Sequence, residues 1–342
     1  MWFRSSLPRV ICIGSVSKDI FFPTDEALLL DTPDDITAKQ KIAFELGGKY
    51  RVKDRYEAVG GVAANVACGL VRLGHQAAVY SCVGDDDMGK SITQSLDEEG
   101  VETRLIKRLG DAKTDLSAIV VMEQNGERTI FHNRDANERL EVSPDSLRGA
   151  PWLFVSALNG DWPKNLANIL SAKQSYDAKI ALNPGQHNIK DDAKRIVNFL
   201  EEVDVLLLNK DEAIELLLHA ETRPSDDELN DERFLLATLY SLGARVIGMT
   251  DGKRGAWGYD GTEYWYCPIH TRDKVVDSTG AGDAFGSGFF SAILSGLPLS
   301  QALRYGMANS GSVVGFYGAI AGLLRVDDLT ALLPLIHPER LQ

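Results

Sequence analysis

The feature that most constrains this chain is a long alternation of strand-like and helix-like segments. Between the strands lie stretches with apolar residues at helical spacing, such as 61–73, which Gly74 terminates, and 89–100. This alternation predicts an α/β fold, in which a doubly wound, mostly parallel sheet carries helices on both faces. The strand-like runs are 10–13, 77–83, 117–122, 128–131, 152–155, 179–182, 205–208 and 245–249.

Two segments depart from this pattern. Residues 20–58 lose clear periodicity and contain prolines, an acidic cluster and the pair Gly47-Gly48. Residues 113–133 hold two strand-like runs around Asn125-Gly126, and an Asn-Gly pair is a strong hairpin signal. We therefore predict one domain over residues 1–342, with lid segments at approximately 20–58 and 113–133 that form a small strand-rich sheet.

The composition excludes several classes of protein. A net charge of −13 argues against binding to nucleic acid, whose phosphates require a basic face. The four cysteines form no Cys-x-x-Cys pair and have no histidine at ligand spacing, so neither a disulfide framework nor a zinc site is expected. No signal-peptide pattern and no long apolar run occurs, so we expect a cytoplasmic protein without membrane contact.

The most informative stretch is 276–290, where a loop of small residues leads into an apolar helical run. Gly280 and Gly282 allow backbone N–H groups to approach an anion, and the start of the helix adds partial positive charge, so a phosphate would bind there. Asp283 lies beside this position and would accept the proton of an attacking hydroxyl group. A helix cap is the alternative explanation for an aspartate at such a position.

Two strings in this chain resemble the signatures of the PfkB carbohydrate kinase family, which includes ribokinase, fructokinase and adenosine kinase. The string DSTGAGDAFGSGFF at 277–290 is similar to the second signature, and GGVAANVA at 60–67 is similar to the first. They occur in the expected order, and the resemblance covers essentially the whole chain. It implies a ribokinase-like fold and phosphoryl transfer from ATP to a hydroxyl group of a small molecule.

The resemblance also implies roles for individual residues at matching positions. Asp283 would be the catalytic base. The anion hole would be formed by Gly280, Ala281 and Gly282. Asp277 and the carbonyl group of Thr279 would bind a monovalent cation, often K⁺, as in many members of the family. The acceptor would be held by Asp19, Gly60, Gly61 and Asn65, since amides and carboxylates bind sugar hydroxyls.

Three further strings match the nucleotide side of the family. Asn209 and Glu212 form its NxxE motif, which helps to order Mg²⁺, partly through water. The turn after the strand at 245–249 resembles the TxGxxG segment that contacts the phosphates of ATP, and it would supply Thr250, Gly252, Lys253 and Gly255. Asn309 matches a position near the adenine.

The chain also departs from ribokinase. Where that enzyme has a glutamate contacting the sugar, this chain has Asn159, so the contact is expected from an amide or from Asp161. Arg134 would meet a phosphate or carboxylate of the substrate, or form a salt bridge at the rim. Aromatic residues in the segment 20–58 would form the core of the lid or stack on a nucleoside base.

We therefore predict an ATP-dependent carbohydrate kinase, with a nucleoside kinase of the adenosine type as the alternative acceptor class. A catalytically silent ligand-binding relative is the alternative of another class, and it would be expected to lack Asp283 or an anion-hole glycine. A dinucleotide-dependent oxidoreductase is disfavoured because no GxGxxG string follows the first strand. Relatives often dimerise through the lid, and the sequence leaves the oligomeric state open.

Overall fold

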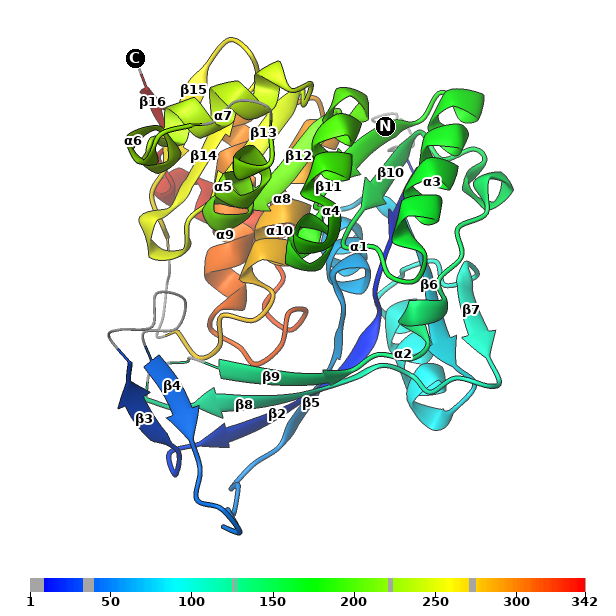
Figure 1. The fold of residues 1–342 in the computed structure, drawn as a ribbon, viewed down its shortest axis with the longest axis vertical. Coiled ribbons are helices and arrows are strands. Elements are labelled where there is room, and N and C mark those ends of the chain that lie inside the picture. The colour runs from blue at the N-terminus through cyan, green and yellow to red at the C-terminus, as the bar shows by residue number, and fades with distance from the viewer. Residues whose placement is uncertain are drawn as a thin grey trace.

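The computed structural model describes residues 9–32, 40–124, 126, 128–220, 224–270 and 275–341, and a large sheet crosses this part of the chain (Figure 1). Neighbouring strands from β13 to β7 are parallel, and the last three on the other side are antiparallel. In order across the sheet, the strands are β16 (Glu339–Leu341), β15 (Tyr264–Cys267), β14 (Ala256–Tyr259), β13 (Val246–Thr250), β12 (Val205–Asn209), β11 (Lys179–Leu182), β10 (Trp152–Val155), β1 (Arg9–Ile13), β6 (Gln76–Gly84) and β7 (Ile106–Leu109).

Helices cover both faces of this sheet and bury two hydrophobic cores. One core is built with residues of α3 (Trp162–Tyr176), α4 (Gly185–Phe199), α5 (Lys210–Leu218) and α7 (Glu232–Ser241). The other is built with residues of α1 (Val62–Arg72), α2 (Asp87–Glu98), α8 (Ala281–Leu294), α9 (Leu299–Val313) and α10 (Val326–Leu332). The short helix α6 (Asp226–Asn230) precedes α7. No helix within the described ranges is long and apolar enough to cross a membrane.

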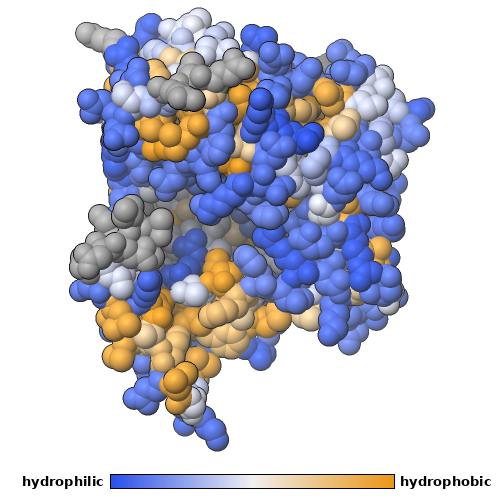
Figure 2. All heavy atoms as spheres, viewed as in Figure 1, coloured by the Kyte–Doolittle hydropathy of each residue, from blue (hydrophilic) through white to orange (hydrophobic). Residues whose placement is uncertain are grey.

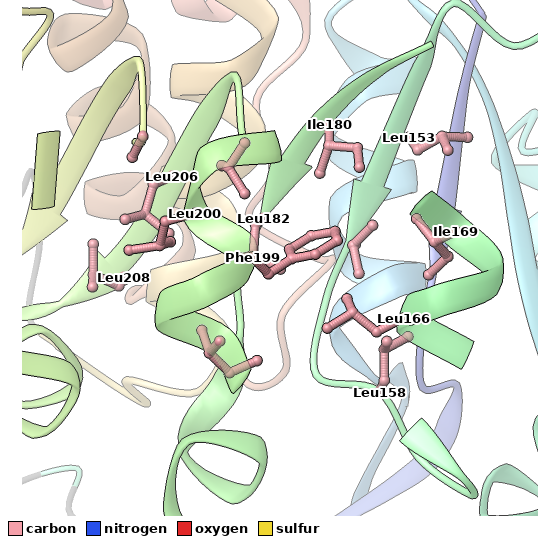
Figure 3. Packing of buried hydrophobic residues seen from close by; sticks show 14 of the residues in the cluster. Leu153, Leu158, Leu166, Ile169, Ile180, Leu182, Phe199, Leu200, Leu206 and Leu208 are labelled. Carbon is pink, nitrogen blue, oxygen red and sulfur yellow. The ribbon is translucent and has the colours of Figure 1, made fainter. Parts of the chain in front are cut away.

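The central strands are apolar throughout because each of their faces meets a layer of helices. In β1, Ile11 and Ile13 belong to one core, whereas Val10 and Cys12 belong to the other. This follows from the two-residue period of a strand, which turns successive side chains to opposite faces. Figure 3 shows the first core, where Leu153, Ile180 and Leu206 of neighbouring strands pack under helices.

A second, smaller sheet lies across one end of the molecule (Figure 1). Its strand order is β5 (Tyr56–Gly60), β2 (Ser17–Thr24), β8 (Leu116–Met122) and β9 (Arg128–Asn133), and β2 pairs with β8 in parallel. The hairpin β3 (Leu28–Asp31) and β4 (Gln40–Ala43) forms a separate pair beside it. Because β2 starts four residues after β1 ends, the small sheet stands at the carboxyl ends of the parallel strands.

The structure confirms the predicted doubly wound fold with a small β-rich sheet. The predicted strands and helices begin and end within about two residues of those observed. Features that were not predicted include the edge strand β7, the antiparallel strands β14, β15 and β16, and the position of Asp19 inside β2 instead of in a turn. The hairpin of β8 and β9 forms as expected, although Asn125 of its turn lies outside the described residues.

Candidate active site

Two helices begin at one point below the small sheet. Asn65 in the first turn of α1 donates from Nδ2 to Oδ2 of Asp283, in the first turn of α8, at 2.8 Å. Both helices direct the partial positive charge of their N-termini to this point, where unpaired backbone N–H groups are available to an anion. The bond joins residues from the two signature-like strings, which are 218 positions apart in the sequence.

Glycine is required at the start of both helices. Gly61 has φ 94°, and a Cβ atom there would lie 2.4 Å from the carbonyl oxygen of Ser15. Gly280 has φ 75°, and a Cβ atom there would lie 2.1 Å from the Cβ of Ala319. A side chain at either position would therefore combine an unfavourable left-handed backbone with a collision.

The first cavity, of about 180 Å³, lies between the small sheet and the starts of these helices. Of the residues that the sequence analysis assigned to the acceptor and the base, it contains Asp19, Gly61, Asn65 and Asp283. Thr279 and Gly280 also line it. The same cavity is lined by further polar residues, of which only Arg134 was given a possible role in the sequence analysis. They are Ser15, Ser17, Asp115, Ser117, His132, Asn133, Arg134 and Asn137.

Strand pairing explains how part of this group assembles. Asp19 on β2 pairs with Ser117 on β8, which in turn pairs with His132 on β9. Side chains at paired positions share one face of a sheet, so these form a row that faces the cavity. Burial raises the pKa of Asp19, and hydrogen bonds from Ser117 and Ser17 oppose that rise.

The second cavity, of about 490 Å³, lies on the other side of the glycine-rich loop. The turn after β13 contributes the residues predicted to contact nucleotide phosphates, Thr250, Gly252, Lys253 and Gly255. Ser278, Ala281 and Gly282 line the same space from the loop that precedes α8. Apolar side chains such as Phe285 and Met307 also line this cavity.

The third cavity, of about 250 Å³, joins Asp283 and Gly282 to Asn209 and Glu212. The latter two form a capping box at the start of α5, with the Asn209 side chain accepting from the Glu212 backbone and the Asn209 backbone N–H donating to Glu212 Oε2. Burial raises the pKa of Glu212, the N–H of Asn209 lowers it, and the charge of Asp283 raises it further. Asn209 and Glu212 thus cap α5 and also line the cavity beside Asp283.

Asp283 lies where the first and third cavities meet. Burial raises the pKa of its carboxyl group to about 6; the hydrogen bond from Asn65 lowers the pKa, and the charge of Asp19 adds to the rise. A carboxylate with such a pKa is ionised at neutral pH, yet is a stronger base than an ordinary aspartate. This is the property needed to take a proton from a hydroxyl group.

Asp277 is fully buried in the loop before α8. Its Oδ1 accepts from the backbone and the hydroxyl of Thr279, and its Oδ2 accepts from the backbone of Gly318 at 3.3 Å. No basic side chain among the described residues pairs with this carboxylate. A buried carboxylate without a counter-charge fits the chemistry of a cation site.

Besides Asp277, four residues with predicted roles do not line these cavities. The side chain of Asn309 is fully buried and is bonded to Ala284, Ser287 and Leu324, so it holds α8 and α9 together instead of facing the second cavity. Asp161 caps α3 by accepting from Lys164. Gly60 lies against the carboxyl group of Asp19, where a Cβ atom would collide with it. Asn159 is buried behind Arg134, which donates to its Oδ1 at 3.1 Å.

The small sheet also reaches the second cavity through a contact that the sequence analysis missed. Arg128 at the start of β9 donates from Nη1 to Oγ of Ser278 in the loop before α8. Arg128, His132 and Arg134 follow the two-residue period of a strand, although the apolar Ile130 interrupts this polar pattern. Only the pairing of the strands shows that this face is the inner one.

Comparison with known proteins gives a consistent result. The model of the pfkB family of carbohydrate kinases matches residues 9–325. The chain is 28% identical over 307 residues to an ATP-dependent 6-phosphofructokinase of Thermoanaerobacterium thermosaccharolyticum, covering 86% of this chain and 90% of the relative. It is also 28% identical over 304 residues to a 2-dehydro-3-deoxygluconokinase of Bacillus subtilis, covering 85% of this chain and 91% of the relative.

Solved structures agree on the fold. The ribokinase of Giardia lamblia superimposes with a TM-score of 0.76 at 22% identity, covering 96% of this chain and 99% of that one. A nucleoside kinase of Burkholderia thailandensis in complex with inosine gives a TM-score of 0.75 at 18% identity, covering 96% and 98%. Since the family model spans nearly all of the sequence, this chain belongs to the pfkB family of carbohydrate kinases.

Proposed function

We propose that this protein transfers a phosphoryl group from ATP to a hydroxyl group of a small sugar or sugar derivative, with Asp283 as the general base. The observation that carries this proposal is the position of Asp283. It is held by Asn65 at the junction between a polar cavity and the space beside the phosphate-binding loop. Membership of a carbohydrate kinase family supports the same reaction.

The proposed reaction is a direct in-line transfer. The acceptor lies in the first cavity with Asp19 and Asn65 contacting its hydroxyl groups, and Asp283 accepts the proton of the attacking one. Backbone N–H groups of Gly280, Ala281 and Gly282 stabilise charge on the transferring phosphoryl group. Positioning and charge neutralisation provide most of the rate enhancement, and no covalent intermediate with the protein is required.

The local charge favours cations as cofactors. Glu212 makes no ion pair among the described residues, and neither does the buried Asp277. We assign Mg²⁺ to the side of Asn209 and Glu212, and a monovalent cation, K⁺ by its chemistry, to Asp277 and the carbonyl group of Thr279. When bound, these ions would neutralise charge on the phosphates and on the loop before α8. A related kinase structure contains ATP and Mg²⁺.

The reaction is tested by initial rates of ATP consumption with magnesium and potassium, across sugars, sugar acids, phosphosugars and nucleosides. Asp283→Asn is expected to lower kcat by roughly 100- to 10,000-fold because it removes the base, with a smaller effect on KM. In the unaltered protein, kcat should fall as the pH drops through about 6, where Asp283 becomes protonated. Undiminished turnover in the variant would remove Asp283 from its role.

A nucleoside acceptor is the second candidate, because nucleoside kinases share the fold. In this chain, aromatic rings of the small sheet pack on each other instead of lining the first cavity: Phe21 and Tyr56 both contact Tyr317. Most residues that line the first cavity have polar side chains, and its apolar side chains are aliphatic. This favours a sugar over a base that would stack on an aromatic ring. The intact Asp283 and glycines disfavour a catalytically silent relative.

We propose further that the chain is one domain in which the small sheet acts as a lid. Large apolar side chains are exposed on this sheet and on the neighbouring hairpin, and Figure 2 shows them gathered there. They include Leu28, Leu30, Phe44 and Phe131. A second copy of the chain would cover such a patch, and light scattering on the purified protein tests for a homodimer. We propose a cytoplasmic location because the reaction consumes ATP.

A further inference from the structure

Strand β9 carries polar side chains that the proposed mechanism does not use. Asn133 lines the first cavity, and so do Ile130, His132 and Arg134 at every second position. This spacing is that of residues on one face of a strand, with Arg134 directly beyond the end of β9. Arg134 therefore lies about 7 Å along the chain from the row formed by Asp19, Ser117 and His132.

Arg134 lacks an acidic partner in the described part of the chain. Its Nη1 donates to the neutral Oδ1 of Asn159 at 3.1 Å, and it takes part in none of the ion pairs there. The nearby Arg139 differs, since it pairs with Asp111 at 2.7 Å and Asp135 at 3.1 Å. A guanidinium group that lines a cavity without a counter-charge is able to bind a carboxylate or phosphate in a bidentate manner.

Asn159 provides a second, independent observation. A guanidinium group only donates hydrogen bonds, so the amide of Asn159 has to turn its oxygen toward Arg134. The Nδ2 of Asn159 is then left buried and without a partner, in a residue that is 3% exposed. An unpaired buried donor is costly, so the orientation of Asn159 indicates that this residue is held in place to position Arg134 at the first cavity.

We propose that the acceptor of this kinase carries an anionic group, a phosphate or a carboxylate, that Arg134 binds with the help of Asn159. This inference deepens the proposed function and rests on it. The anion lies at the end of the acceptor away from the hydroxyl group that faces Asp283. A neutral sugar or a nucleoside would leave the charge of Arg134 without a counter-charge.

The test compares acceptors that differ only in charge. One pair is fructose 6-phosphate and fructose, and the other is 2-dehydro-3-deoxygluconate and its methyl ester. Each is measured by initial rates with the unaltered protein, with Arg134→Gln and Arg134→Lys, and with Arg148→Gln. The last is a control because Arg148 is an exposed arginine that pairs with Asp145 outside the cavities.

The charged member of one pair is expected to have the higher kcat/KM, and the pair that responds identifies the anion as phosphate or carboxylate. Arg134→Gln should raise the KM for that acceptor by roughly 10- to 100-fold, since a charged hydrogen bond is lost. The KM of the Arg134→Lys protein for that acceptor should lie between those of the unaltered protein and Arg134→Gln. The KM for the neutral member of the pair should be the same in all of these proteins. A preference for neutral sugars or nucleosides, or an equal loss for both members, would overturn the inference and leave the kinase reaction standing.

Calorimetric titration of the Asp283→Asn protein separates the two proposals when no acceptor is turned over. Binding of a charged probe that disappears on adding Arg134→Gln, but persists with Arg148→Gln, supports the anion site and counts against the reaction. If no charged probe binds, the anion site is refuted. Neither result depends on catalysis, because the base is absent from the protein being titrated.

Discussion

At the scale of single residues, two glycines of the loop before α8 allow the backbone conformation of the loop to be tested separately from phosphate binding. Gly280 has a left-handed φ of 75° and lies against Ala319, whereas no atom lies within 4 Å of the position that a Cβ of Gly282 would take. Both glycines are expected to contact the phosphoryl group. Only the first is required for the fold of the loop.

We predict that Gly280→Ala lowers the free energy of unfolding by at least about 1–2 kcal/mol, the cost of a left-handed alanine before any collision is counted. Gly282→Ala should leave that free energy unchanged or raise it by up to about 1 kcal/mol, because alanine is the better helix residue. Both variants should have lower kcat. Urea denaturation and initial rates provide the measurements, and an equal loss of stability in the two variants would contradict the steric argument.

The sequence was most informative about functional residues that lie close together in the chain. The loop that contains Asp283 is continuous, so its glycines and its carboxylate could be recognised together. His132 and Arg134 are different, because their place in the first cavity depends on how β9 pairs with β8, across a turn whose register is not written in the local sequence. The internal hydrogen bonds of Asn309 could not be predicted because their partners come from distant segments.

At the scale of elements, the segment after α9 joins the small sheet to the loop before α8. Tyr317 stacks on Tyr56 of β5 with ring centroids 4.3 Å apart, and the next residue, Gly318, donates to Asp277. The backbone of Val276 also donates to Val314 at 2.8 Å. The position of the small sheet and the shape of the phosphate-binding loop are therefore mechanically connected.

We predict that Tyr317→Ala lowers kcat by roughly tenfold and raises the KM of the acceptor, since small displacements of reacting groups are costly in such transfers. Tyr317→Phe keeps the ring and should behave like the unaltered protein. Steady-state rates with varied acceptor provide the measurement. A Tyr317→Ala protein that melts at a lower temperature but keeps its kcat and KM would reduce the stacking to a purely structural contact.

Local patterns also explain which elements were missed. Strands β14 and β15 follow two glycine-containing turns and are only four residues each, so they gave no periodic signal long enough to separate from loops. Strand β16 pairs with β15 through residues more than 70 positions apart. The parallel strands were found more easily because both of their faces are buried and their runs are uniformly apolar.

At the scale of the whole molecule, a buried histidine makes the stability dependent on pH. His75 follows α1 and its Nε2 lies 2.8 Å from Oγ of Ser291 on α8. Burial lowers the pKa of His75 from 6.5 to about 4, and the contact with Ser291 opposes this. Between these values the unfolded chain binds a proton that the folded chain does not, so the folded state loses stability as the pH falls.

We predict a decrease of up to about 3 kcal/mol in the free energy of unfolding from this residue as the pH is lowered from 6.5 to 4. Asp283 acts in the opposite direction, since its pKa is raised to about 6 and its folded form gains a proton as the pH falls. Urea unfolding of the unaltered protein and of His75→Gln, at several pH values, isolates the first contribution. Parallel pH profiles for the two proteins would show that His75 does not contribute.

Strand β9 fixes the distances between the side chains along its inner face. Its inner face places Arg128 beside Ser278 and carries the row through Ile130 and His132 to Arg134, in steps of about 7 Å. The rise of a strand is set by covalent geometry, so these steps hardly stretch. An acceptor anchored at Arg134 would thus be selected by the number of atoms between its anion and its reacting hydroxyl group. Accepting a shorter molecule would require a new anchor one full step away, at residue 132.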